Sequence, residues 1–320
     1  MKILVTGGSG FIGHYLCESL IKKGHNVVNV DIEGPTTHSD NDKFEWLECN
    51  ILDRNKVNSI FREFEPEIVY HLAAKADVFG KTLADYRMNI EGTANILAAC
   101  NALATVKHVI VTSTQLVIKP DFIPKAIDDY APLDQLYSLS KVKTEELTRQ
   151  KSFSFNWTII RPTNIWGPRH PRFPNEIWKY IEKGWYFQSS KDVKRSYGYV
   201  ENIVYQMLKI IEVDPEQVNS KTFYVGDEPV YSLEWVDGFS YALRGKKSIT
   251  LPNYLFKATA LFGEILNKLG LPAPIHMDRY RSMTTEYTVP MEDTFNVLGK
   301  GPYSLKEGIA ITVRSLKNEK

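Results

Sequence analysis

A glycine-rich segment directly behind an apolar run constrains the fold of this chain more than any other feature. Residues 6–13 read Thr-Gly-Gly-Ser-Gly-Phe-Ile-Gly and follow the apolar residues 3–5. The apolar run predicts a buried strand over 2–6, and the glycines predict a tight turn into a helix that begins near residue 11. A turn without side chains lets the backbone approach a pyrophosphate, and the helix N-terminus stabilises its negative charge. The segment therefore predicts a dinucleotide-binding turn.

The second apolar segment ends in an acidic residue. Residues 26–30 read Asn-Val-Val-Asn-Val, and Asp31 follows them. A carboxylate at this point accepts hydrogen bonds from a ribose 2′-OH and repels a 2′-phosphate. Lys43 or another nearby cation could still offset such a phosphate. The pattern favours NAD over NADP as the cofactor.

Strand and helix patterns alternate through the first half of the chain. Besides the strands over 2–6 and 26–31, we expect strands over 44–48, 67–72, 107–113 and 157–160 and helices over 11–23, 54–63, 82–103 and 136–151. The strands are continuously apolar, as in residues 108–111 (His-Val-Ile-Val), which is typical of a parallel sheet covered on both faces. The fold class we expect is therefore α/β, with a Rossmann-type doubly wound parallel sheet.

The second half is less regular and follows a proline-rich loop that contains Pro162, Pro168, Pro171 and Pro174. We expect helices near 174–183, 200–213, 232–243, 253–269 and 304–317. A chain of this length suits a large domain with a smaller second one. We expect an NAD-binding Rossmann domain over 1–165, to which segments of 185–225 contribute, and a smaller α/β substrate-binding lid mainly over 166–320.

One expected helix is unusually apolar. Residues 255–266 carry apolar side chains at helical spacing. Such a helix could lie on a membrane surface, but the segment has few basic residues for that role. We expect it to pack against the second domain or against a partner subunit.

Composition excludes several classes of protein. The chain has 39 Lys and Arg against 38 Asp and Glu, and this balance gives no global attraction to nucleic acid. No apolar stretch reaches the roughly 18 residues that span a bilayer, and the apolar start leaves no room for a signal peptide. The three cysteines form no C-x-x-C pair, and the seven histidines show no metal-ligand spacing. We expect a cytoplasmic protein with buried thiols, without a metal site, a membrane span or a nucleic-acid partner.

Tyr137 and Lys141 form a Y-x-x-x-K pattern inside the helix expected over 136–151. Residues four apart share one helix face, so the ammonium can lie near the phenol. Lowering a tyrosine pKa from ~10 to ~7 requires about 4 kcal/mol, which the lysine and a positive nicotinamide ring could supply together. The tyrosine would then act as a base for a hydroxyl or an acid for a ketone. By itself the pattern also fits an exposed aromatic residue followed by a lysine.

Three hydroxyl residues, Thr112, Ser113 and Thr114, stand at the end of the strand expected over 107–113. Ligands of open α/β sheets bind outside the carboxyl ends of the strands. Thr114 could therefore hold a substrate oxygen in line with Tyr137. Capping of a turn is the alternative role for such hydroxyls.

Taken together, these motifs resemble the NAD-dependent epimerase/dehydratase type of extended short-chain dehydrogenase/reductase. The resemblance covers essentially the whole chain. The matching segments are 6–13, Asp31, 71–74, 89–93, 112–114, Tyr137 with Lys141, 161–169, 195–202, 298–299 and 304–309.

The resemblance implies a role for each matching position. Tyr137 would be the acid/base, Lys141 would tune its pKa, and Thr114 would position the substrate. The residues it assigns to the cofactor are Gly7, Gly10, Phe11, Ile12, Gly13, Asp31, Asn50, Ile51, Leu72, Ala73, Ala74, Asn89, Thr112, Tyr137, Lys141 and Pro162. Those it assigns to the diphosphate of a nucleotide sugar are Asn164, Arg195 and Arg281, with Arg279 as the alternative to Arg281.

One departure from the family pattern narrows the activity. Family dehydratases follow the catalytic Thr with Asp-Glu, which supply acid and base for water loss, whereas this chain has Gln115-Leu116. The resemblance therefore implies a nucleotide-sugar epimerase, similar to UDP-glucose 4-epimerase, that uses NAD and a transient keto-sugar. A nucleotide-sugar 4-ketoreductase, a 3β-hydroxysteroid-type dehydrogenase and a cofactor-sensing binding protein are the alternatives. The family also implies a homodimer, formed through the helix that carries Tyr137 and the one near 89–103.

Overall fold

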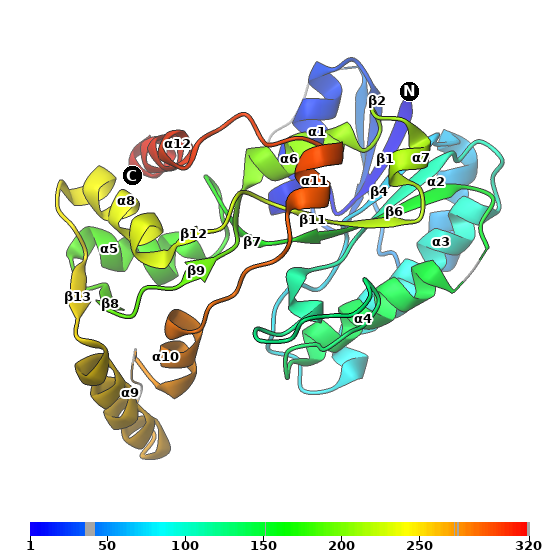
Figure 1. Ribbon diagram of the computed structural model, residues 1–320. Coiled ribbons are helices and arrows are strands. Elements are labelled where there is room, and N and C mark those ends of the chain that lie inside the picture. Colours follow the sequence, from blue (N-terminus) through cyan, green and yellow to red (C-terminus); the bar gives the residue numbers. More distant parts are fainter. Residues whose placement is uncertain (36–41, 151, 272, 274, 319–320) are drawn as a thin grey trace. The chain divides into compact units, whose positions relative to one another are not determined.

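The computed structural model describes residues 1–35, 42–150, 152–271, 273 and 275–318, and its chain forms two compact units. The first unit comprises Met1–Asn164, Val200–Gly226 and Pro290–Pro302. The second comprises Ile165–Tyr199, Asp227–Val289 and Tyr303–Lys320. Figure 1 shows the elements of both. The functions assigned above to two domains stay predictions.

A seven-stranded parallel sheet forms the centre of the first unit, in the order β11-β6-β5-β4-β1-β2-β3. The expected α/β doubly wound sheet is thereby confirmed. The chain order reverses between β1 and β4, and ligands of such sheets bind at the carboxyl ends beside this switch point. The strands are β1 (Lys2–Thr6), β2 (Asn26–Asp31), β3 (Phe44–Glu48), β4 (Ile68–His71), β5 (His108–Thr112), β6 (Asn156–Pro162) and β11 (Lys221–Val225).

Helices cover both faces of this sheet. On one face, α2 (Arg54–Phe64) and α3 (Thr93–Asn101) contribute Val57, Phe61 and Ile96 to a core with strand residues such as Val69. Tyr70, the next residue of β4, points to the opposite face, where its hydroxyl donates to the Met207 carbonyl. That carbonyl belongs to α6 (Val200–Lys209), which packs against α1 (Phe11–Lys22). The remaining helices of this unit are α4 (Leu136–Arg149), α7 (Pro215–Val218) and α11 (Glu292–Val297).

The helix expected over 82–103 is not continuous. A 3₁₀ turn (Leu83–Tyr86) is followed by a π-helical turn (Met88–Gly92) before α3 begins. The Asn89 carbonyl accepts hydrogen bonds from the hydroxyls of Thr93 and Thr144, and these side chains stabilise the wider turn. Such turns often occur at functional sites.

The second unit is built on aromatic side chains. Trp235 and Phe239 of α8 (Ser232–Arg244) contact Trp166, with ring centroids 6.0 Å and 5.5 Å from that of Trp166. The expected helix near 174–183 consists of a π-helical turn (Pro174–Trp178) followed by α5 (Lys179–Lys183). The other helices are α9 (Asn253–Lys268), α10 (Met277–Thr284) and α12 (Leu305–Asn318). The paired strands are β7 (Asn164–Trp166), whose first residue belongs to the first unit, with β10 (Tyr197–Tyr199), β8 (Phe187–Ser189) with β13 (Ile249–Leu251), and β9 (Lys194–Arg195) with β12 (Val230–Tyr231).

Three observations bear on the excluded classes. Within the described ranges, no helix has the length and apolar character needed to cross a bilayer. The same residues contain no group of three or more His, Cys, Asp or Glu placed to hold a metal ion. Cys17, Cys49 and Cys100 are free and buried, as expected.

Candidate functional site

The turn between β1 and α1 has no room for side chains at two of its glycines. Gly7 has a φ of +74°, and a Cβ there would lie 2.6 Å from the Ala73 amide nitrogen. A Cβ on Gly13 would lie 2.2 Å from the Gly7 carbonyl oxygen. Gly10 is the N-cap of α1 and has no side chain to bond the first-turn amides. The backbone N–H groups and positive helix end at this turn fit a pyrophosphate.

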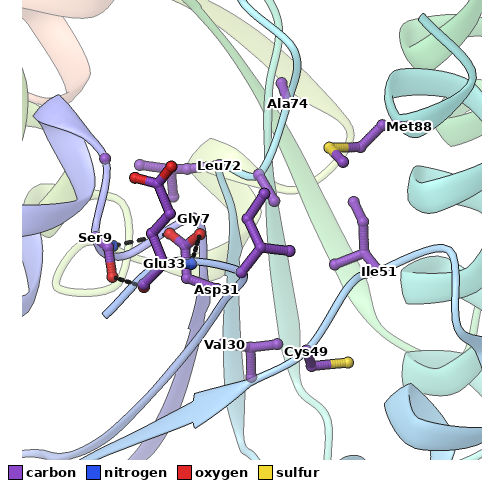
Figure 2. Close-up of a pocket in the computed structure, with 13 residues that line it drawn as sticks. Gly7, Ser9, Val30, Asp31, Glu33, Cys49, Ile51, Leu72, Ala74 and Met88 are labelled. Atoms are coloured by element: carbon purple, nitrogen blue, oxygen red, sulfur yellow. Dashed lines mark hydrogen bonds between the residues drawn. The ribbon is translucent and has the colours of Figure 1, made fainter. Parts of the chain in front are cut away.

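A pocket of about 200 Å³ lies at the carboxyl ends of β1, β2 and β4. Figure 2 shows Ser9, Asp31 and Glu33 on one side of it and Ile51 and Met88 on the other. One wall thus offers hydrogen-bond acceptors for ribose hydroxyls, and the other offers apolar contact for a flat base. The lining residues are Gly7, Ser9, Gly10, Val30, Asp31, Ile32, Glu33, Cys49, Ile51, Leu72, Ala73, Ala74 and Met88.

The Asp31 carboxylate is held by the backbone. The Ser9 amide donates to Asp31 Oδ2 at 3.0 Å, and the Glu33 amide donates to Oδ1 at 3.3 Å. The Ser9 hydroxyl in turn donates to the Glu33 carbonyl at 2.7 Å. Because a carboxylate has about four acceptor positions, Asp31 retains capacity for ribose hydroxyls. The Glu33 side chain adds a second negative charge to the pocket, which disfavours a 2′-phosphate further.

Lys43 does not offset this negative charge. The register of β2 and β3 pairs Val27 with Phe44 and Asp31 with Glu48, so Lys43 lies at the opposite end of β2 from Asp31. Its Nζ donates to the Gly24 carbonyl at 3.3 Å. The sequence interpretation in which Lys43 balances a phosphate was therefore wrong.

Tyr137 and Lys141 are both buried in the first turns of α4. Lys141 Nζ donates to the Thr112 carbonyl at 2.8 Å, which ties the helix to the end of β5. Burial lowers the pKa of Lys141 to about 8, although the Glu145 carboxylate opposes this shift. At neutral pH the lysine therefore remains mostly protonated. A buried lysine is uncommon and its charged form is costly, so this position is a candidate functional site.

The hydroxyl groups at the end of β5 have different partners. Thr114 caps a short 3₁₀ turn (Gln115–Val117), where its Oγ1 accepts from the Leu116 amide at 3.3 Å. The capping alternative is thus observed, but the bond leaves the hydroxyl proton of Thr114 available to a substrate. Thr112 Oγ1 is buried and has no hydrogen-bond partner among the described residues. The strand end therefore retains unused polar capacity.

A buried ion pair lies one helical turn beyond Lys141. Arg161 of β6 donates from Nε and Nη2 to the two oxygens of Glu145, both at 2.8 Å, and both side chains are fully buried. Ser113 donates to the same carboxylate at 2.6 Å. Burial opposes ionisation of Glu145, but the hydrogen bonds and charge of Arg161 outweigh it and hold the Glu145 pKa below its usual value. The pair fixes α4 against the segment that carries Thr114.

Sequence reasoning missed this pair, although two signals pointed to it. Glu145 follows Lys141 by four residues and therefore shares its helix face. Arg161 follows Ile159 and Ile160 in an apolar strand, where a charged residue requires a partner.

A relay of hydrogen bonds through His71 joins the glycine turn to the π-helical turn. The Thr93 hydroxyl donates to the Asn89 carbonyl, so it accepts from His71 Nε2 at 2.9 Å. His71 Nδ1 then accepts from the Thr6 hydroxyl at 2.7 Å, and that oxygen accepts from the Ala73 amide at 3.2 Å. The network assigns a neutral His71 with its proton on Nε2.

Two buried histidines predict acid sensitivity of the first unit. Burial lowers the pKa of His71 to about 3 and that of His108 to about 4, from an ordinary 6.5. The unfolded chain therefore binds more protons below pH 6.5, and stability is present above that pH and is lost as the pH falls. We expect the free energy of unfolding to drop by about 3 kcal/mol per pH unit between pH 6 and 4.

Urea unfolding at pH 6, 5 and 4 measures this slope. His108→Gln keeps a donor for Thr158, to which His108 Nε2 is bonded at 2.8 Å, but removes the titrating group. We expect the variant to lose about half of the slope. An unchanged slope in this variant would show that His108 does not contribute to the acid response.

The structure brings together part of the predicted cofactor set. The predicted residues that line the pocket are Gly7, Gly10, Asp31, Ile51, Leu72, Ala73 and Ala74. Phe11, Ile12 and Gly13 form the first turn of α1. The lining residues that sequence reasoning missed are Ser9, Val30, Ile32, Glu33, Cys49 and Met88. Ser9 and Glu33 could have been found from their places within the glycine turn and two residues after Asp31.

Other predicted residues bind within the protein. Asn89 is 1% exposed, and its side chain bonds to Ser140 Oγ and to both backbone groups of Lys75. Asn50 Oδ1 accepts from the Leu52 amide at 3.0 Å. Pro162 ends β6, paired with Val225 of β11. Contacts of Asn89, Asn50 and Pro162 with a cofactor stay predictions.

Two of the predicted diphosphate residues lie close together in the second unit. Arg195 of β9 donates to the Ser282 carbonyl of α10, one residue beyond Arg281. Arg281 is 69% exposed and pairs with Asp278 at 3.4 Å. Arg279, the alternative, lies over the Tyr186 ring at 5.8 Å. The third predicted residue, Asn164, belongs to the first unit.

The chain matches a known protein family over most of its length. The family model described as "NAD dependent epimerase/dehydratase family" matches residues 3–226. A UDP-N-acetyl-alpha-D-glucosaminuronate decarboxylase of Bacillus cytotoxicus is 30% identical over 73% of this chain and 78% of its own length. A UDP-glucose 4-epimerase of Mycolicibacterium smegmatis is 31% identical over 53% of this chain, and the match spans 58% of that relative's length.

Among solved structures, a UDP-glucuronic acid 4-epimerase from Bacillus cereus in complex with UDP-glucuronic acid and NAD has the same fold. The two chains superimpose with a TM-score of 0.76 over 100% of both, at 22% identity.

Proposed function

The chain belongs to the NAD-dependent epimerase/dehydratase family, and we propose that it is a nucleotide-sugar 4-epimerase, similar to UDP-glucose 4-epimerase. In this proposal Tyr137 is the acid/base. The observation that carries the proposal is the buried Lys141, four residues from Tyr137 and bonded to the end of β5. The 4-epimerases among the relatives and solved structures support it.

The proposed chemistry assigns one task to each of three side chains. Tyr137 takes the proton of the sugar hydroxyl and later returns it to the oxygen of the transient keto-sugar. Lys141 supplies the positive charge that favours the tyrosinate, since it is largely protonated at neutral pH. The Thr114 hydroxyl donates to the reacting oxygen. NAD, which Gly7, Gly10 and Asp31 would hold at the glycine turn, would supply the hydride acceptor and donor for that sugar carbon.

Two residues argue against water loss in this site. Gln115 and Leu116 form the 3₁₀ turn behind Thr114 and carry no carboxyl group. These positions therefore lack the two carboxyl groups that would act as acid and base in a 4,6-dehydration. A homodimer through the helices near 89–103 and 136–151 and a cytoplasmic location stay predictions.

Cofactor preference gives a first check of the pocket. Asp31→Asn preserves the shape of the side chain and removes a negative charge next to the position of a 2′-phosphate. We expect the ratio of NADP to NAD dissociation constants to fall at least about tenfold, or ~1.4 kcal/mol. Titration of intrinsic fluorescence with each nucleotide measures it. Lys43→Gln, at the far end of β2, is the control and should leave this ratio unchanged. If Asp31→Asn also leaves the ratio unchanged, Asp31 does not determine the selectivity for NAD.

Redox neutrality tests the proposed class of reaction. An epimerase regenerates its NAD, so many turnovers should proceed with NAD well below the substrate concentration and without a lasting rise in absorbance at 340 nm. A rise that matches the substrate consumed would assign net oxidation. Consumption of NADH with a keto-sugar but no epimerisation would assign a ketoreductase.

A further inference from the structure

Helix α9 of the second unit is covered along only one narrow stripe. Its buried residues are Phe256, Ala260 and Gly263, and the helix packs against α10 and β8. Figure 1 labels α9 beside α10. Large apolar side chains remain exposed over the rest of its surface, namely Tyr254 (72%), Leu255 (44%), Leu261 (48%), Phe262 (61%) and Ile265 (55%), followed by Leu269 (71%) and Leu271 (54%).

The exposed apolar residues form a continuous face. Leu255, Phe262 and Leu269 are seven residues apart, and Leu261 and Ile265 are four apart, so successive turns place them next to one another. Packing within the unit, one of the two roles expected from the sequence beside packing against a partner subunit, accounts for the buried stripe alone. A contiguous apolar face of this kind indicates an interaction surface.

The charge around α9 differs sharply from that of the whole chain. The chain has a net charge of +1, whereas residues 244–282 contain seven Lys or Arg and two Asp or Glu. The cations are Arg244, Lys246, Lys247, Lys257, Lys268, Arg279 and Arg281, and the acids are Glu264 and Asp278.

Four of these cations are available to an anionic surface. Lys246, Lys247, Lys257 and Lys268 are exposed, and none of them forms an ion pair within the part of the chain that the structure describes. Glu264, the acidic residue of α9, is partly buried. The basic residues that were few within 255–266 are therefore supplied by its flanks.

The positive charge around α9 favours an anionic lipid surface over a second copy of the chain as the partner of its apolar face. A second copy of the chain, docked by two-fold symmetry, would place the same cationic segments against each other. An anionic lipid surface complements them, and apolar side chains of an amphipathic helix insert between lipid headgroups. We propose that α9 lies in the surface of an anionic bilayer and holds the enzyme there, with Phe262, Ile265 and their neighbours in the acyl boundary and the lysines at the headgroups.

Vesicle flotation with the full-length protein tests the proposal. We expect the protein to float with vesicles of phosphatidylcholine containing 30% phosphatidylglycerol and to remain unbound with pure phosphatidylcholine. Phe262→Gln with Ile265→Gln should reduce the bound fraction at least about tenfold, because the inserted apolar area is lost. Lys246→Glu with Lys247→Glu should do the same and should remove the salt dependence.

Matched controls separate this surface from general stickiness. Ile123→Gln removes an apolar side chain that is 90% exposed on the first unit, and Lys306→Glu reverses an exposed charge on α12. Both should bind vesicles as the unaltered protein does. All variants should retain turnover of soluble substrate, which confirms folding.

Two results would overturn the proposal. One is absence of flotation with the anionic vesicles. The other is equal vesicle binding by the α9 variant and the unaltered protein. If sedimentation velocity then shows that the variant has lost self-association, the face is an interface between copies of the chain.

Discussion

Replacing Tyr137 by phenylalanine is expected to lower kcat by about 10²–10⁴-fold, the usual contribution of a positioned acid/base. The ring is buried and packs against that of Tyr86, with centroids 6.2 Å apart, and phenylalanine preserves this contact. Folding should therefore be unchanged. Steady-state kinetics measures kcat, thermal melting measures stability, and an assay of bound nucleotide measures the NAD content.

Tyr86→Phe is the matched control for this prediction. The Tyr86 hydroxyl accepts from the Gly80 amide and donates to the Asp77 carbonyl, so its removal should cost stability and leave kcat near its original value. Near-normal turnover in the Tyr137 variant would show that another group moves the proton.

Arg161→Met is expected to destabilise the first unit by about 3–5 kcal/mol, because it leaves the fully buried carboxylate of Glu145 without its strongest partner. Urea unfolding measures this loss. Arg149→Met removes a weaker contact to the same carboxylate, at 3.4 Å and with 16% exposure, and also the hydrogen bonds of Arg149 to Tyr130 and Thr222. It should cost about 2 kcal/mol.

The double variant Glu145→Gln, Arg161→Met removes both charges and should recover much of the lost stability. A cost of Arg161→Met no greater than that of Arg149→Met would contradict the account of the pair. Because Glu145 accepts a hydrogen bond from Ser113, the residue before Thr114, we also expect Arg161→Met to raise KM.

The first half of the fold follows closely from the sequence, because local and global signals agree there. Strands β1, β4 and β5 carry continuous apolar runs, and residues 6–13 force a turn at one point. The edge strand β11 was not expected, since Lys221–Val225 is a short run that pairs with β6 across a long separation in the chain. Non-local pairing leaves no periodic signal.

In the candidate site, too, features with a local sequence signal were predicted and features that depend on non-local packing were not. The spacing could place Gly7 and Asp31 at the pocket because backbone approach and strand ends leave a local sequence signal. Lys43 was misjudged because strand register, not proximity in sequence, determines which end of β2 it occupies. The Glu145–Arg161 pair depends on the packing of α4 against β6, which neither segment encodes alone.

The exposed face of α9 illustrates the limit of periodicity. An apolar helical pattern at 255–266 predicts a helix with a buried side, but the pattern cannot say what buries it. Solvent exposure of Phe262 and Ile265 supplied the missing fact.

The most direct test of the proposed epimerase is a proton NMR time course with UDP-, GDP-, CDP- and dTDP-sugars and a catalytic amount of NAD. We predict that one sugar of a C4-epimeric pair gives rise to the anomeric signal of the other, and that reactions started from either member converge on the same mixture while no NADH accumulates. Failure of every sugar to produce a second epimer, with NADH rising as substrate is lost, would contradict the proposal.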